Sequence, residues 1–408
     1  MTAKRFIITT LFAGLTVLFI AVLAMAVFRE EPGSNSYVAL AEAFLHGQLH
    51  VDGCLDEDCA LFDGKAYVVF PPLPALMILP LVAIFGSDFH YFLPLSIFAF
   101  AATAMLWWRI GGALTESRDL RALLLLLILF ATPLIFVTLR GDHIWFFAQI
   151  WAFLFTTAAL YSALISRSAL LAGLFIALAF LCRQMSILYL PFLYVLMMED
   201  ERPLWHIDRA AFARGLKLIA FPIAAVAAYL AYNWVRFGSP LETGYSYLFP
   251  VSLDRPGVDP GFIKHRMRDL GAFAIEYFPF NTLYMFFQGP HVEFAGRYLT
   301  EMKSFDNNGA SLFLVTPVLL FAFLARWTRT FWIGLITCAV ILGITLFYHS
   351  NGFSQYSTQR YALDWLPILL VFLALGLKRE YAPPLAILTV YSMAVTLGMI
   401  AIGGMLAG

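Results

Sequence analysis

Acidic residues cluster early in the chain, in a stretch that also contains two cysteines. The carboxylates in this stretch are Asp52, Asp56, Glu57, Asp58 and Asp63. A carboxylate can act as a general base toward a hydroxyl group, and the alternative is a solvated loop that carries charge without chemistry. One member of the cluster is therefore a candidate catalytic base.

Cys54 and Cys59 flank three of these acids. On an oxidising side of a membrane, two cysteines at this spacing can close a disulfide that holds the acidic loop. Free or metal-bound thiols are the alternative, but the cysteines and scattered histidines match no zinc spacing. We expect the disulfide, no metal site and no required cofactor; a divalent cation is an alternative that the spacing does not predict.

Arginines at the ends of apolar runs are the second group that could do chemistry. They are Arg140, Arg183, Arg236 and Arg360. A guanidinium group is a planar fork that matches phosphate oxygens, whereas a single arginine at a helix end often only anchors the helix at the membrane interface. A carboxylate that faces several arginines at the edge of a lipid phase suits transfer of a group from a lipid phosphate. Further polar candidates are Asp142, His143, His291, His349 and Tyr356.

The elements that must position these residues are apolar. The 408 residues are 61% apolar and 13% charged, with 40 Phe and 9 Trp, whereas a soluble protein has about 45–50% apolar and about 25% charged residues. The composition predicts an all-α polytopic membrane protein that forms one domain over residues 1–408. The net charge is zero and the chain has no basic tail, which argues against nucleic acid as a partner.

Eleven apolar stretches have about the length needed to cross a membrane. They are 6–28, 88–109, 122–139, 144–166, 168–182, 184–198, 217–235, 311–325, 331–348, 362–377 and 382–405. The first is too long for a signal peptide and lacks a cleavage site, so we expect a retained helix with a cytoplasmic N-terminus. The segments predicted to be cytoplasmic then carry 14 of the 26 basic residues but only 7 of the 26 acidic ones, in agreement with the positive-inside rule.

Two long segments, 29–87 and 236–310, are predicted to lie on the extracytoplasmic side. In the first, Tyr37, Leu40 and Phe44 recur at helical spacing and predict an amphipathic helix at the membrane surface. The stretch 71–86 contains four prolines and predicts a second interfacial or partly buried helix.

Several stretches resemble a known family of membrane enzymes. They are SYVALAEAFLHGQLHVD, DGKAYVVFPPLPALMILPLVAIFG, FIALAFLCRQMSILYLPFLYVLM, NWVRFGSPLETGY and STQRYALDWLPILLVFLALG. In their order along the chain they are similar to the GT-C superfamily of polytopic glycosyltransferases, which includes protein O-mannosyltransferases and lipid A aminoarabinose transferases.

The resemblance implies transfer of a sugar, with inversion, from a polyprenyl-phosphate donor to a lipid, glycan or protein acceptor. It also implies a site on the extracytoplasmic face of a bacterial inner membrane, in contact with membrane lipids. The family's usual acid after the first span is absent from residues 33–37. The expected bases are therefore Asp58 first, then Asp63 and Glu31. The residues expected to bind the donor phosphate are Arg183, Arg236, Arg360 and Lys65.

Two other classes of protein compete with this interpretation. A ligase or polymerase that uses a polyprenyl-diphosphate glycan would share the spans and the arginines, but would need no carboxylate base near the first helix. A transporter or flippase commonly has internal repeats and a site at mid-membrane. The sequence contains no convincing repeat, and its ionisable residues gather at predicted helix ends.

Overall fold

The computed structural model describes residue 14 and residues 33–56, 58–115, 117–198, 208–254, 256–352 and 356–406. The predicted first span, 6–28, and two of the acids, Glu31 and Glu57, lie outside the described residues. The protein is mostly helical, with 68% helix, and its strands form two separate two-stranded antiparallel sheets.

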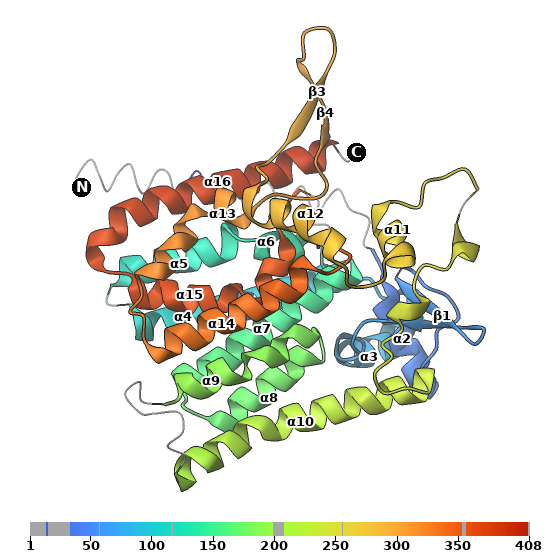
Figure 1. The fold of residues 1–408 in the computed structure, drawn as a ribbon, viewed down its shortest axis with the longest axis horizontal. Helices are drawn as coiled ribbons and strands as arrows, with labels where there is room; N and C mark the ends of the chain where they lie inside the picture. Colours follow the sequence, from blue (N-terminus) through green and yellow to red (C-terminus); the bar gives the residue numbers. More distant parts are fainter. Residues whose placement is uncertain are drawn as a thin grey trace.

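Five helices among the described residues are long and apolar enough to cross a membrane, judged by length and composition. They are α4 (Phe92–Leu114), α7 (Ile144–Leu164), α10 (Arg209–Phe237), α14 (Arg329–Leu346) and α16 (Ala382–Leu406). Each coincides with a stretch predicted as a span. In α7, 83% of the residues in its 18-residue apolar stretch are buried, against 28% in α4 and α10. Helix α7 is therefore the central helix of the bundle (Figure 1).

The other predicted spans are shorter or broken, so the described residues do not contain eleven long helices. The segments in question are α5 (Arg118–Phe130), α6 (Leu134–Leu139), α8 (Ala169–Phe180), η2 (Gln184–Tyr189), α9 (Leu190–Leu196), α13 (Leu312–Val315), η7 (Pro317–Leu324), η8 (Arg360–Asp364) and α15 (Leu366–Gly376). Proline lies at or near the start of α6, α9, η7 and α15. Because proline lacks an amide hydrogen and is favoured in the first turn of a helix, a new helix starts at the proline in these apolar runs.

The chain segments 33–91 and 238–270 lie at the same end of the molecule (Figure 1). The first contains α2 (Ser36–Leu45), β1 (Cys59–Phe62), β2 (Lys65–Val68), α3 (Leu73–Phe85) and η1 (Gly86–Asp88). The second contains η3 (Tyr245–Tyr247), η4 (Val251–Leu253) and α11 (Phe262–Asp269). A backbone bridge between Ala60 and Leu248 joins the two segments.

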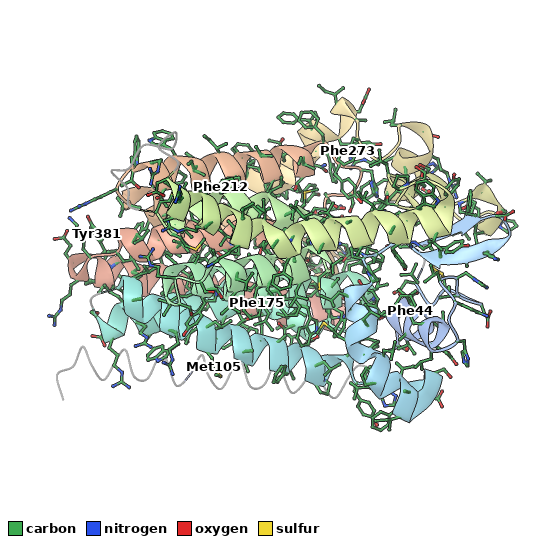
Figure 2. The ribbon with its side chains drawn as sticks, turned by 90° about the horizontal axis from the view of Figure 1, so that it is seen from below. Phe44, Met105, Phe175, Phe212, Phe273 and Tyr381 are labelled. Atoms are coloured by element: carbon green, nitrogen blue, oxygen red, sulfur yellow. A yellow bond between two sulfur atoms is a disulfide. The ribbon has the colours of Figure 1, made fainter. Side chains whose placement is uncertain are left out.

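The remaining short elements follow α11 in the sequence. They are η5 (Ile275–Tyr277), α12 (Phe278–Thr282), the π-helix η6 (Leu283–Phe287), the hairpin of β3 (Val292–Ala295) and β4 (Glu301–Phe305), and η9 (Arg379–Tyr381). Figure 2 shows Phe44 of α2 and Tyr381 of η9 near opposite ends of the long axis. The α2 end therefore lies far from the turn that precedes α16.

The helix predicted near residue 36 is present as α2, and its place at a membrane surface stays a prediction. Besides Tyr37, Leu40 and Ala41, three residues of α2 outside the predicted apolar face are buried: Ser36, Val38 and Ala43. These residues are buried because α2 packs against α3. This packing makes α2 part of the protein core.

Candidate functional site

A cavity of about 370 Å³ lies at the α2 end of the molecule. Its lining comes from the segments 33–91 and 238–270, the start of α7 and the region around η8. The lining includes the polar and aromatic residues Asp58, Trp145, Tyr245, Lys264, Tyr348, His349, Ser350, Arg360 and Tyr361. Most of the lining surface is apolar or aromatic, with a few polar groups, as is typical of small-molecule sites.

The cavity brings together Asp58 and Arg360, the predicted base and one of the predicted phosphate-binding cations. Asp58 directly precedes β1, and its Oδ2 accepts a hydrogen bond from Trp145 Nε1 in the first turn of α7. Arg360 begins η8, is 5% exposed and donates to the Gly352 carbonyl oxygen. Its Nη1 also donates to Gln149 Oε1 on α7, at 3.3 Å. Both site residues are therefore attached to the same central helix.

Arg183 does not line the cavity, but it contacts a residue that does. It sits between α8 and η2, and its Nε and Nη2 donate to the two carboxylate oxygens of Asp364 at 2.7 and 2.5 Å. Its Cζ lies 5.2 Å from the centre of the Tyr361 ring, which does line the cavity. The structure thus places Arg183 next to the site, with much of its donor fork occupied by a carboxylate.

The other residues of the predicted catalytic and phosphate-binding sets that the structure describes are not in the lining. Arg236 is 3% exposed and donates to the Val68 carbonyl oxygen and Asn233 Oδ1, both at 2.7 Å, so it joins α10 to β2. Asp63 and Lys65 are exposed at the turn of the β1–β2 hairpin. The structure does not bring these three residues to the cavity.

Asp142 and His143 form a polar cluster next to Trp145 rather than part of the lining. The Asp142 carboxylate lies 3.5 Å from both Arg140 Nε and His143 Nε2. The His143 ring stacks on Trp145, with 5.5 Å between ring centres, and burial lowers the pKa of His143. Trp145 donates a hydrogen bond to Asp58 and packs against His143, so this cluster contacts the site through Trp145.

His291 and Tyr356, the other polar candidates, lie outside the lining as well. His291 is exposed just before β3, where its carbonyl oxygen accepts from the Asp306 amide at 3.0 Å. Tyr356 packs edge-on against Phe136, at 5.7 Å between ring centres. Neither position suggests a role at the cavity.

The acidic loop is held by a disulfide and by hydrogen bonds to the start of α2. Cys54 and Cys59 are joined by a disulfide. Asp56 Oδ2 accepts from the Ser36 amide at the start of α2, at 2.7 Å, and the Ser36 hydroxyl accepts from the Asp56 amide at 3.0 Å. Burial raises the pKa of Asp56, although the Ser36 hydrogen bonds oppose the shift. Asp56 therefore attaches the loop to α2 and leaves Asp58 at the cavity.

Sequence reasoning missed most of the aromatic wall and Lys264. Tyr245, Tyr348 and Tyr361 all line the cavity, but aromatic residues are too frequent in this chain for any one to stand out. The basic run FIKHRMRD, which forms α11, was the available signal for Lys264. In the part of the chain that the structure describes, no group of three His, Cys, Asp or Glu residues is arranged to hold a metal ion.

Comparison of the chain with protein-family models, curated proteins and solved structures found no match.

Proposed function

We propose that this protein is a membrane glycosyltransferase that moves a sugar from a polyprenyl-phosphate donor to a hydroxyl group of a lipid, glycan or protein acceptor. The observation that carries the proposal is the pairing of Asp58 and Arg360 in one aromatic cavity. A carboxylate and a guanidinium group supply the two functions that the reaction needs: removal of a proton and stabilisation of a phosphate.

In the proposed reaction, the Asp58 carboxylate takes the proton of the acceptor hydroxyl group. The acceptor oxygen then bonds to the anomeric carbon as the bond from that carbon to the donor phosphate breaks. The electron pair of the broken bond leaves with the phosphate, whose growing negative charge Arg360 stabilises. A single displacement of this kind inverts the anomeric centre.

The proposed glycosyltransferase spans a membrane. The shorter apolar helices α8, η2–α9 and α15 would complete a GT-C-like bundle with about eleven crossings and a cytoplasmic N-terminus. The α2 end would then face the extracytoplasmic side of a cell-envelope membrane. The apolar tail of the donor would lie along the helices, where its burial costs no hydration.

Replacement of Asp58 by asparagine tests the proposed base. Asparagine keeps the shape of the side chain and can still accept from Trp145, but it cannot take a proton. We expect turnover of purified protein with polyprenyl-phosphate sugars to fall by at least about a hundredfold, measured as released polyprenyl phosphate. Turnover at the wild-type rate would remove Asp58 from this role.

Asp88 is a matched control for this experiment, because it is an exposed aspartate of η1 at the same end of the molecule. Asp88→Asn should leave turnover within about twofold of the wild type, and the melting temperatures of both variants should match it. Turnover of a polyprenyl-diphosphate glycan, with release of polyprenyl diphosphate, and none of polyprenyl-phosphate sugars would indicate the competing ligase or polymerase function.

A further inference from the structure

The polar side chains that line the cavity are of two chemical kinds. Asp58 is an acidic side chain and Lys264 and Arg360 are basic ones, whereas His349 and Ser350 stand among aromatic rings. The proposed transfer uses Asp58 and Arg360. It leaves the polar groups of the second set without a role, although both residues are buried.

His349 is held rigidly where it lines the cavity. It is 4% exposed, and its ring centre lies 4.2 Å from that of Tyr348 and 6.2 Å from that of Tyr245. Its amide donates to the Ala272 carbonyl oxygen at 2.9 Å, and its own carbonyl oxygen accepts from Arg266 Nη1 at 3.1 Å. These contacts fix both the backbone and the ring before any ligand binds.

The imidazole is neutral at neutral pH. Its Nδ1 is fully buried and has no hydrogen-bond partner among the described residues, so a proton there would be a donor without an acceptor. Burial lowers the pKa of His349 to about 4. A neutral imidazole offers one donor and one acceptor, which matches a hydroxyl group better than a phosphate.

Ser350 adds a second uncharged group beside His349. Its hydroxyl oxygen accepts from the Gly352 amide at 3.1 Å, so the hydroxyl hydrogen remains available to donate. The faces of the neighbouring tyrosine rings can cover the C–H groups of a sugar ring. The combination of neutral hydrogen-bonding groups and aromatic faces suits a carbohydrate.

We propose that His349 and Ser350 contact hydroxyl groups of the transferred sugar and determine which sugar the protein accepts. This inference rests on the proposed function and deepens it, since it assigns the sugar and the phosphate to different residues of one cavity. His349 and Ser350 act on specificity, whereas Arg360 acts on the lipid phosphate.

The test compares polyprenyl-phosphate glucose with two donors that each differ from it at one hydroxyl position: polyprenyl-phosphate galactose, the C4 epimer, and polyprenyl-phosphate mannose, the C2 epimer. The wild type should prefer one of them by at least about tenfold in kcat/KM, because a buried polar group left unpaired by the wrong epimer is costly. His349→Leu should lower kcat/KM for the preferred donor by about ten- to hundredfold and bring the three values within about threefold of one another. His349→Gln should restore part of the preference, and Ser350→Ala should change the ratios with little change in backbone structure.

The control is binding of sugar-free polyprenyl phosphate, measured as ligand-induced thermal stabilisation. Its affinity should stay within about twofold in the His349 variants and fall in Arg360→Gln. Equal use of the three donors by the wild type, unchanged ratios in the variants, or a matching loss of polyprenyl-phosphate binding would overturn the inference. If the wild type neither binds nor consumes any of these lipids, the proposed function fails, and the inference fails with it.

Discussion

The ion pair between Arg183 and Asp364 should contribute strongly to stability. Both side chains are mostly buried, with 19% and 7% of their surfaces exposed, and two hydrogen bonds of 2.7 and 2.5 Å join them. Removal of one partner from a buried pair leaves an uncompensated charge and costs about 3–5 kcal/mol. Because Arg183 is partly exposed, we expect the lower end of this range, about 3 kcal/mol, for Arg183→Met and for Asp364→Asn.

A double-mutant cycle measures this contribution. The free energy of unfolding would be determined in mixed micelles for the wild type, both single variants and the double variant. The double variant should be more stable than the sum of the single losses predicts, with a coupling energy of about 2–3 kcal/mol. Arg118→Met is the control, because Arg118 is an exposed arginine, and it should change stability by less than about 0.5 kcal/mol. Additive losses in the cycle would refute the reasoning.

Two further predictions concern packing and pH. Gly173→Ala should destabilise the protein by about 1–3 kcal/mol, because a Cβ there would lie 2.2 Å from the Leu218 carbonyl oxygen of α10, whereas Gly343→Ala, with no atom within 4 Å of its Cβ, should not; thermal unfolding of both variants checks this. Stability should also fall as the pH drops from about 6.5 toward 4, since the unfolded chain binds a proton at His349 before the folded chain does, whose pKa there is about 4. This difference is worth about 3 kcal/mol, and an unchanged pH profile of unfolding in His349→Gln would contradict it.

The sequence predicts where the apolar helices lie better than how long they are. Composition and apolar runs locate both ends of α4, α7, α14 and α16 to within about five residues, whereas α10 begins at Arg209, eight residues before its predicted span. They also locate the segment 122–139, but Pro133 divides it into α5 and α6. The prolines are visible in the sequence, yet whether a proline kinks a helix or ends it depends on the partners of the freed backbone groups.

The candidate site is only partly predictable for a related reason. Arg236 and Arg360 both stand at ends of apolar stretches, so the sequence cannot separate them. Tertiary partners do so: Arg236 is bonded to the Val68 carbonyl oxygen and lies outside the lining, whereas Arg360 is bonded to Gln149 and lies within it. Similarly, the contact of Asp58 with Trp145 joins residues far apart in the chain.

Asp56 and Asp58 show why position within the acidic loop decides what each carboxylate can do. The two residues share a loop and a flanking disulfide, but the Asp56 carboxylate already accepts the Ser36 amide at the start of α2. A helix start has amide hydrogens that need acceptors, so Asp56 is committed to structure. Asp58 lines the cavity instead and accepts from Trp145 through one oxygen. Of these two carboxylates, Asp58 is therefore the one to which we assign the proposed role of base.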